Sequence, residues 1–309
     1  MIYVFKNNFT SLVVIFFLQL SSTIAQSPLP TYMQSVTGYI LEPLPKGYLQ
    51  TAGQSTAIFS ELQTYGNDSN KRIRSEAYSL AANVGKKSSV QEVRTAAIDF
   101  VIEGIQKEKD NGLIGRYFNS LKQFEKKDFS REAKSGLINL IDKKTPHLKT
   151  LFMLIGFLDL KEGESAMEAI ETKSKSIVQA RNLALVRMGN ADKLNQMMKN
   201  IRAMPLNDDF IYNMVPLLTY VRKKESFDYL IELLQNDRAN CTPADAETEG
   251  NITCGYRLME SIAPYIIDYP FELDAGGDII TKNYQKALAS AKKWTTKNLK
   301  KYSLNNEIY

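Results

Sequence analysis

Few residues in this chain have side chains that point to a specific chemistry. One histidine and two cysteines occur among 309 residues. Zinc sites normally need several His or Cys ligands, and Ser-His-Asp or Cys-His catalysis needs a histidine beside a nucleophile. His147 follows Pro146 where a helix is expected to begin, so a surface or capping role is the simpler interpretation. With no phosphate-loop, Cys-x-x-Cys or Gly-x-Ser-x-Gly motif present, the sequence predicts no catalytic residue, metal or cofactor.

Cys241 and Cys254 enclose a polar segment, 242–253, and are predicted to form a disulfide. A ring of this size contributes about 3 kcal/mol in the chain-entropy model. The segment is either a stapled insertion or a presented binding loop, and the sequence leaves both readings open. Its acidic spacing resembles an EF-hand loop, but position 12 is Tyr256, which cannot supply the bidentate carboxylate, so calcium binding is not expected. Asp274 and Asp278 are interpreted as a helix stop and an N-cap.

The first 25 residues have the pattern of a signal peptide. Lys6 precedes the apolar run 12–18, and small residues lead to a cleavage position between Ala25 and Gln26. A membrane anchor is the alternative, but it needs about 20 apolar residues, and polar residues interrupt this stretch. We therefore expect an exported protein, periplasmic or secreted, with no membrane span after cleavage. Asn67, Asn240 and Asn251 fit the glycosylation pattern, which matters only in a glycosylating host.

The elements that position these residues are expected to be helices. An apolar spacing of i, i+3, i+4, i+7, which forms one stripe on a helix, recurs six times. The quartets are Ala77/Leu80/Ala81/Val84, Ile114/Tyr117/Phe118/Leu121, Leu151/Leu154/Ile155/Leu158, Ala180/Leu183/Ala184/Arg187, Met214/Leu217/Leu218/Val221 and Met259/Ile262/Ala263/Ile266. Second helices repeat the stripe near 98–105, 194–201 and 227–234. Because no pair of short helices covers its own stripe, neighbouring pairs must stack.

The domain organisation follows from this repeat. Prolines and glycines in 26–50 predict an extended lead-in without a long helix, followed by a capping helix at 51–65. We expect the helical repeat domain to cover 51–303 and a tail to cover 304–309.

The stretch 178–201 (VQARNLALVRMGNADKLNQMMKNI) resembles the HEAT-repeat family, as does 74–85. Pro216 and Pro264 are similar to the kinking prolines of that family's first helices. The resemblance implies an all-α, right-handed α-α superhelix of about six helical pairs. The departures are Arg187, which intrudes into an apolar quartet, and a longer last interval.

Charge and architecture together limit the function. Seven lysines and one glutamate lie in 279–309, while acids and bases nearly balance elsewhere, so the basic terminal helix is interpreted as a solvated face. We expect an exported, non-enzymatic scaffold that binds a protein or peptide. The alternatives are a carbohydrate-active enzyme on an α/α scaffold, with two converging carboxylates, and a protein like the HEAT-like DNA glycosylases. Nucleic-acid binding is not expected from the charge, and the oligomeric state stays open.

Overall fold

The computed structural model describes residues 27–38, 40–142, 144–243 and 249–309. Within these ranges all regular secondary structure is helical, apart from three isolated β-bridges, which confirms the all-α prediction. The signal peptide and its cleavage position between Ala25 and Gln26 lie outside the described residues. The helices are α1 (Leu29–Ser35), α2 (Tyr48–Ala52), α3 (Ala57–Gly66), α4 (Lys71–Lys87), α5 (Gln91–Lys107), α6 (Asn111–Leu121), η1 (Lys126–Asp128), α7 (Arg131–Asn139), α8 (Leu148–Leu158), η2 (Lys161–Gly163), α9 (Glu164–Ala169), α10 (Lys175–Arg187), α11 (Ala191–Arg202), α12 (Asp208–Asn213), α13 (Val215–Val221), α14 (Lys224–Leu234), α15 (Gly255–Ile262), η3 (Ala263–Tyr265) and α16 (Tyr284–Asn298).

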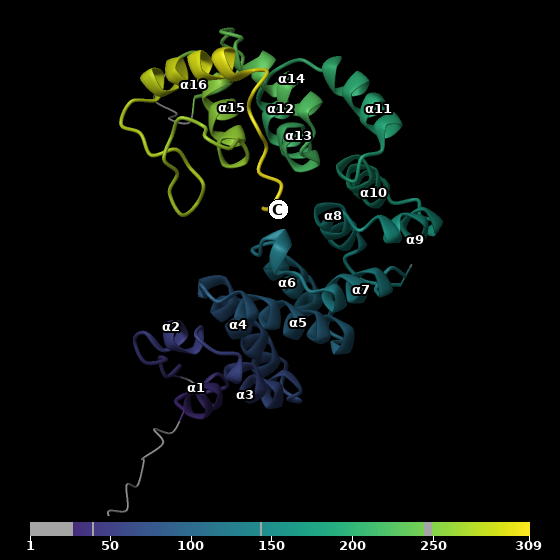
Figure 1. Ribbon diagram of the computed structural model, residues 1–309, viewed down its shortest axis with the longest axis vertical. Coiled ribbons are helices and arrows are strands. Elements are labelled where there is room, and N and C mark those ends of the chain that lie inside the picture. Colours follow the sequence, from purple (N-terminus) through teal and green to yellow (C-terminus); the bar gives the residue numbers. More distant parts are fainter. Residues whose placement is uncertain (1–26, 39, 143, 244–248) are drawn as a thin grey trace, which may run out of the picture.

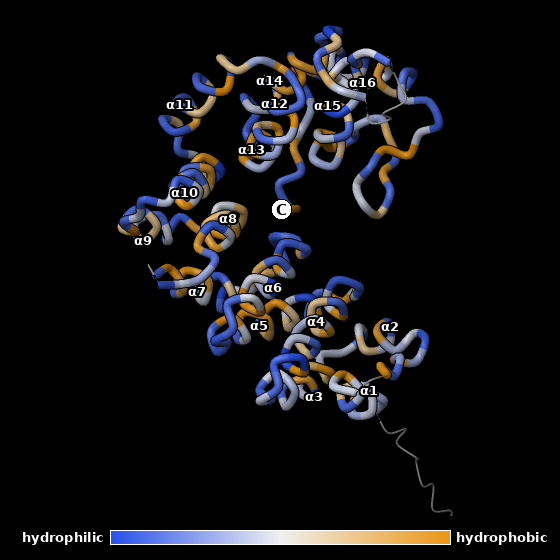
Figure 2. The backbone as a smooth tube through the Cα atoms, turned by 180° about the vertical axis from the view of Figure 1, so that it is seen from behind, coloured by the Kyte–Doolittle hydropathy of each residue, from blue (hydrophilic) through white to orange (hydrophobic). Residues whose placement is uncertain are grey.

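The helices follow one another along a curved path that forms an open C (Figure 1). α1 to α3 lie at one end of the C, α14 to α16 lie at the other, and α8 to α10 form its back. Helices pack mainly against near neighbours in sequence: α4 against α3 and α5, α10 against α8, and α14 against α13 and α15. Hydrophobic positions recur along the whole arc rather than in one central cluster (Figure 2). This is the packing that helical pairs need when none covers its own apolar stripe.

The predicted stripes account for this packing. All four members of the quartet are buried in α4, α6, α8 and α10, and the second-helix stripes of α5 and α14 are buried as well. Gly156 allows α8 and α10 to approach closely, because a Cβ at this position would lie 2.5 Å from the Cα of Ala184.

The buried side chains form two clusters. The first extends from Leu29 to Met188 and the second from Leu183 to Ala291. Met153 and Tyr309 are partly buried and pack against both clusters. The end of the chain therefore takes part in joining the two halves of the core.

The N-terminal region differs from the prediction. The lead-in is not extended throughout, since residues 29–35 form α1. Pro28 and Pro30 do not prevent this helix, because they lie at the N-cap and in the first turn, where the missing N–H has no intrahelical partner. The predicted capping helix at 51–65 is also wrong in its bounds: α2 ends at Ala52 and α3 begins only at Ala57.

The last two pairs are interrupted where proline occurs. Pro216 does not kink one long helix but lies in the first turn of α13, which is separated from α12 at Met214. α15 ends at Ile262, and Pro264 lies in η3. Proline removes an N–H and clashes with the carbonyl four residues earlier, which explains both breaks.

The long segment between α15 and α16 differs from the prediction for Asp274 and Asp278. Asp274 is not a helix stop: its side chain accepts hydrogen bonds from the amides of Gly276 and Asp278 in a tight turn. The N-cap of α16 is Asn283 rather than Asp278.

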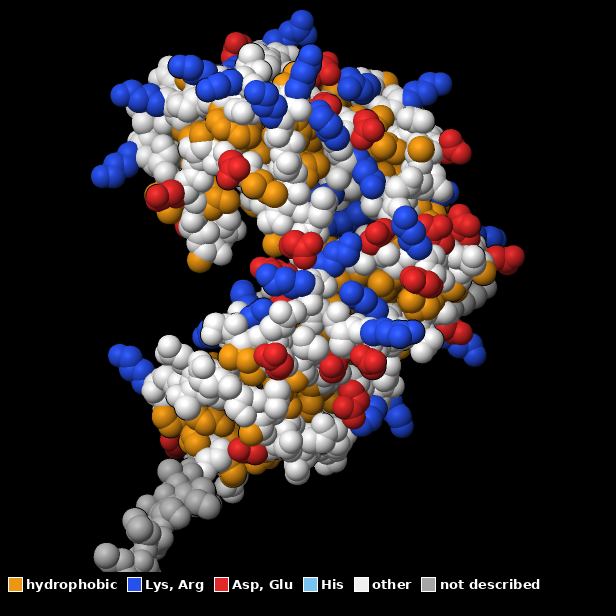
Figure 3. All heavy atoms as spheres, viewed as in Figure 1, with side chains coloured by type: hydrophobic (Ala, Val, Ile, Leu, Met, Phe, Trp, Pro, Cys, Tyr) orange, Lys and Arg blue, Asp and Glu red, His pale blue; other side chains and the backbone are white. Residues whose placement is uncertain are grey.

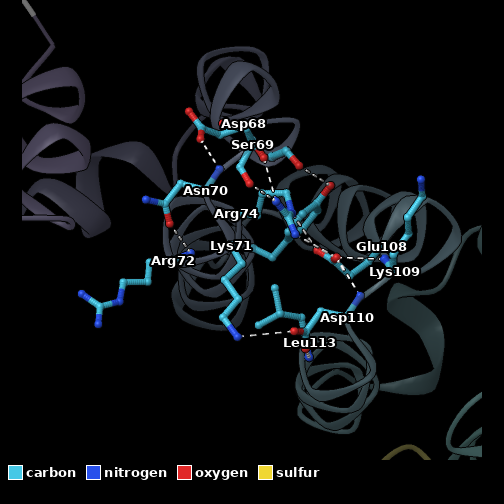
Figure 4. A network of polar contacts seen from close by, with 12 residues as sticks. Asp68, Ser69, Asn70, Lys71, Arg72, Arg74, Glu108, Lys109, Asp110 and Leu113 are labelled. Carbon is cyan, nitrogen blue, oxygen red and sulfur yellow. Dashed lines mark hydrogen bonds and ion pairs between the residues drawn. The ribbon is translucent and has the colours of Figure 1, made fainter.

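In the first half of the arc, arginines join successive pairs through carboxylates. Arg74 near the start of α4 donates to both oxygens of Glu108, at 2.8 and 3.0 Å (Figure 4). Arg94 near the start of α5 donates to Asp128 at 2.8 Å. The two carboxylate side chains are only 3% and 2% exposed. Hydrogen bonding from Arg74 lowers the pKa of Glu108. The first ion pair therefore ties α4 to the end of α5, and the second ties α5 to η1.

Candidate functional site

Two adjoining cavities lie where α10 meets α8, α11 and α13. The outer cavity, about 770 Å³, is bounded by α10, α11 and the start of α13. The inner cavity, about 300 Å³, is bounded by α8, α10 and α13. Gln179, Leu183 and Leu217 line both cavities, so the two adjoin, and we call them together the α10 groove.

The outer part of the α10 groove has an apolar floor and a basic rim. Its floor is built mainly from aliphatic and thioether side chains: Leu183, Val186, Met197, Ile201, Met214 and Leu217. Met204 stands at the edge and is 43% exposed. Lys173, Lys175 and Lys193 also line it. Among the described residues that line either cavity, none is aspartate or glutamate.

Local sequence explains why these residues face the groove. The stripe of α10 is buried on α8 through Gly156, which leaves the flank with Gln179 and Asn182 directed to the outer cavity. The break between α12 and α13 leaves Met214 and Leu217 only half-buried. The same proline that interrupts the predicted helix thus helps to open the groove.

Two buried arginines lie near the inner end of the groove. Arg187 is 8% exposed and Arg222, which lines the inner cavity, is 5% exposed. Among the described residues, neither guanidinium forms an ion pair with an Asp or Glu side chain. Burial lowers the pKa of Arg187, and burial followed by the charge of Arg187 lowers the pKa of Arg222 to about 10. The hydrogen-bond acceptors of these two cations are therefore groups other than carboxylate side chains.

Aromatic rings and carbonyl groups surround the two guanidinium groups. Arg187 lies over the rings of Phe157 and Tyr220, at 5.0 and 4.8 Å from their centroids. Arg222 lies 3.5 Å from the centroid of Tyr265. Arg187 donates to the carbonyl oxygen of Tyr220 at 2.8 Å. Cation–π contacts of this kind stabilise desolvated cations but leave donors on each guanidinium for a further acceptor.

The chain's own last residues supply those acceptors. Residues 303–309, which we call the tail segment, leave α16 and run into the hollow of the C (Figure 1). Arg187 donates to the carbonyl oxygen of Ile308 at 3.1 Å. Arg222 donates to the main-chain oxygens of Asn305 and Tyr309, both at 3.1 Å. Figure 3 shows Lys and Arg side chains together with Asp and Glu side chains at the waist of the molecule.

The tail segment is held along its length by its main chain. It forms an antiparallel bridge between Leu304 and Ile266, in which the amide of Asn305 donates to the carbonyl of Tyr265 at 2.9 Å. At the other side of the hollow, the amide of Lys126 donates to the carbonyl of Glu307 at 2.8 Å. The tail segment thus spans from η3 in the second half of the arc to η1 in the first.

Tyr309 anchors the end of the tail segment by its ring. The ring centroid lies 5.6 Å from that of Phe157 and 5.8 Å from that of Tyr220, and Lys122 lies 5.2 Å from it. Burial raises the pKa of Tyr309 to about 12. We call the surface formed by Lys122, Phe157, Arg187, Tyr220, Arg222 and Tyr265 the tail cradle. Tyr309 also lines the inner cavity, so the cradle and the α10 groove meet.

Arg222 has an unusual backbone conformation. It is the C-cap of α13 with φ 51°, in the left-handed region. A non-glycine residue held there costs roughly 1 to 2 kcal/mol.

The cysteines predicted to form a disulfide line neither cavity of the α10 groove. Cys241 and Cys254 are bonded through their sulfurs, with Cα atoms 5.1 Å apart, and both are fully buried. Asp208 at the start of α12 holds the ring, since it accepts from the amide and hydroxyl of Thr242 and pairs with Arg257. The centre of the 242–253 segment, including Asp245 and Glu247 of the EF-hand-like spacing, lies outside the described residues. The disulfide ring therefore belongs to the second half of the arc, and none of its described residues lines the α10 groove.

His147 is an exposed residue at the N-cap of α8, with φ 60°. Its Nε2 lies 2.7 Å from the carbonyl oxygen of Asn111, which ties α8 to the start of α6. In the ranges the structure describes, no group of three or more His, Cys, Asp or Glu residues could hold a metal ion. Asn67, Asn240 and Asn251 are all exposed.

The arginines of the cradle were visible in the sequence but not recognised as a site. Arg187 stood out as a charge at an apolar stripe position, which is the signal that could have found it. Arg222 belonged to a polar turn, and residues 304–309 were only a tail. The partners lie 83 to 121 residues apart in sequence and meet through main-chain atoms, which leave no residue pattern.

The chain matches no protein-family model, no curated protein and no solved structure. Of the helices in the described ranges, none is both long enough and apolar enough to cross a membrane.

Proposed function

We propose that this protein is an exported, non-enzymatic scaffold of the HEAT-like α-solenoid type, which binds a protein partner through an extended segment lying in the α10 groove. The observation that carries the proposal is that a peptide already lies at the inner end of this groove. The tail segment is extended there and is held through main-chain oxygens by Arg187 and Arg222. A surface that binds one extended segment in this way is chemically suited to bind another.

The lining of the groove indicates the chemistry of the partner segment. An apolar floor of leucine, valine and methionine suits aliphatic or aromatic side chains, and methionine adapts to several shapes. The lysine rim without acids favours aspartate or glutamate on the partner, because complementary charge orients and accelerates binding. We therefore expect an extended segment that carries both apolar and acidic side chains.

The repeat architecture and export complete the proposal. Packing of helical pairs mainly against their neighbours supports a right-handed superhelix of about six pairs, as in HEAT repeats, whose binding surface is extended. A disulfide between Cys241 and Cys254 is compatible with an oxidising compartment, and the N-terminal sequence predicts export.

A carbohydrate-active enzyme is less well supported at this site. Glycoside hydrolysis needs two carboxylates about 5 to 9.5 Å apart. The described residues lining the α10 groove offer none.

The proposal is tested by selecting peptides from a random library on the oxidised, immobilised protein. We expect selected peptides to be rich in acidic and apolar residues. Lys193→Glu on the groove rim should weaken their binding at least tenfold, through charge reversal. Lys199→Glu is the matched control, because Lys199 is on the same helix but does not line the groove, and it should change binding less than threefold. Selected peptides that bind both variants equally would contradict the proposal, as would release of reducing sugar from an oligosaccharide.

A further inference from the structure

The tail segment is bound as a peptide ligand would be bound, rather than as a buried part of the core. Its hydrogen bonds to the rest of the protein use main-chain atoms of Ser303, Asn305, Glu307, Ile308 and Tyr309. The side chains of Asn306 and Glu307 are exposed. The ring of Tyr309 packs against both core clusters and so anchors the end. Recognition therefore specifies an extended main chain with an aromatic ring at the position of Tyr309 and an apolar side chain at that of Leu304. It is indifferent to the exposed side chains of Asn306 and Glu307.

The tail cradle also needs an occupant. Arg187 and Arg222 are buried cations, and the carbonyls of the tail segment are their acceptors on the open side of the cradle. Buried donors that lose their acceptors carry the full desolvation penalty. A second extended segment that presents carbonyls at the same places removes this penalty equally well. Exchange of one segment for another is therefore far easier than simple loss of the tail.

The position of Tyr309 connects the cradle to the α10 groove. Tyr309 lines the inner cavity together with Leu183 and Leu217, which also line the outer cavity. When the tail segment is in place, it closes the inner end of the groove. When another segment takes the cradle, the groove and the cradle become one continuous track for a longer peptide.

We infer that residues 303–309 are an intramolecular competitor, which a partner's extended segment with an aromatic anchor displaces from the tail cradle. This inference rests on the proposed function and deepens it, because it names how the partner is recognised and what regulates access. The apparent affinity for every such partner equals the intrinsic affinity multiplied by the fraction of molecules in which the tail has left the cradle.

The experiment uses a labelled synthetic peptide of residues 303–309 and the full-length protein. Tyr309→Ala removes the anchor of the chain's own tail, so fluorescence anisotropy should show the peptide binding this variant at least tenfold more tightly than the wild type. Tyr284→Ala is the matched control, since Tyr284 is exposed on α16 and takes no part in the cradle, and it should bind like the wild type. Asn305→Pro is a second variant, which deletes one hydrogen bond to Tyr265 without changing either core cluster, and it should also increase peptide binding.

Variants of the peptide test the mode of recognition. A peptide in which residues 305–307 are replaced by serine should bind the Tyr309→Ala protein within threefold of the original. A peptide lacking the aromatic ring at its last position should bind at least tenfold more weakly. Equal binding of the tail peptide to the wild type and both tail variants, or loss of binding with the serine peptide, overturns the inference.

Different results would contradict partner binding in the α10 groove and displacement of the tail segment. If peptides selected from the library bind in a Lys193-dependent way but the tail peptide does not bind the Tyr309→Ala protein, the inference fails and the proposed function stands. If the tail peptide binds but no selected peptide depends on Lys193, the groove proposal fails and the cradle stands.

Discussion

Half-buried arginines in the first half of the arc and buried arginines near its middle have different hydrogen-bond acceptors. In the first half, Arg74 and Arg94 are paired with the carboxylates of Glu108 and Asp128, each 34 residues further along the chain. Near the middle, Arg187 and Arg222 instead donate to main-chain oxygens, some in α13 and the rest in the tail segment. A carboxylate held at a helix end or in a turn cannot leave without disturbing the helices beside it. A tail can leave while the helices remain, so only the second arrangement is suited to exchange with a partner.

The largest expected effect comes from breaking a carboxylate pair in the first half. Glu108→Ala leaves Arg74 without its partner in a half-buried site, which should lower the free energy of unfolding by about 3 to 5 kcal/mol. Glu103→Ala is the matched control on α5, because its pair with Lys107 is exposed, and it should cost less than about 1 kcal/mol. Urea unfolding measures both. Similar costs for the two variants would remove the basis for treating the buried pairs as structural ties.

Reduction of the disulfide should affect only the second half. Opening the Cys241–Cys254 ring is expected to cost no more than about 3 kcal/mol, because the ring is short. Hydrogen exchange with and without reductant should show loss of protection confined to residues after about 225. Loss spread evenly over all helices would mean that the ring stabilises the whole arc, and no change would mean that the ring adds nothing.

Acid should weaken the first half through Glu108. Its pKa is lowered in the folded protein, so its contribution is present above the unfolded pKa of about 4.3 and is lost as pH falls through the folded value. The stability difference between the wild type and Glu108→Gln should therefore narrow between pH 6 and pH 3. Urea midpoints across this range provide the measurement. A stability difference that stays constant with pH would show that the charge of Glu108 does not stabilise its contact with Arg74.

The smallest expected effect on global stability belongs to the tail. Tyr309→Ala should lower the free energy of unfolding by less than Glu108→Ala does, because the main-chain oxygens of the tail segment can still accept from Arg187 and Arg222 when the ring is lost. If Tyr309→Ala lowered the free energy of unfolding as much as Glu108→Ala does, the tail would be a structural element like the buried ion pairs. It could then not leave while the helices remain folded.

The sequence predicted well what depends on helical periodicity. The stripes of α4, α5, α6, α8 and α10 are buried as expected, since burial of one face per helix is a local property of spacing. The predicted helix boundaries were wrong where a proline lies near the start of a helix. Pro30 lies in the first turn of α1, and Pro216 lies in the first turn of α13, which is separate from α12. The candidate site was missed, because the contacts of Arg187 and Arg222 to residues 305–309 are main-chain contacts over long sequence distances. Only the charge of Arg187 within an apolar stripe hinted at it.

Native-state hydrogen exchange of three amides shows directly whether the tail segment leaves the cradle while the helices stay folded. The amides of Lys126 and Ile267 donate to carbonyls of the tail segment, and the amide of Asn305 donates from it. If the tail is an exchangeable ligand, these three amides exchange together, at least a hundredfold faster than the interior amides of α5, although they lie in three separate parts of the chain. Addition of a cradle-binding peptide should expose the amide of Asn305 while it keeps the amides of Lys126 and Ile267 protected. Exchange of all three amides only at the rate of global unfolding would contradict the account.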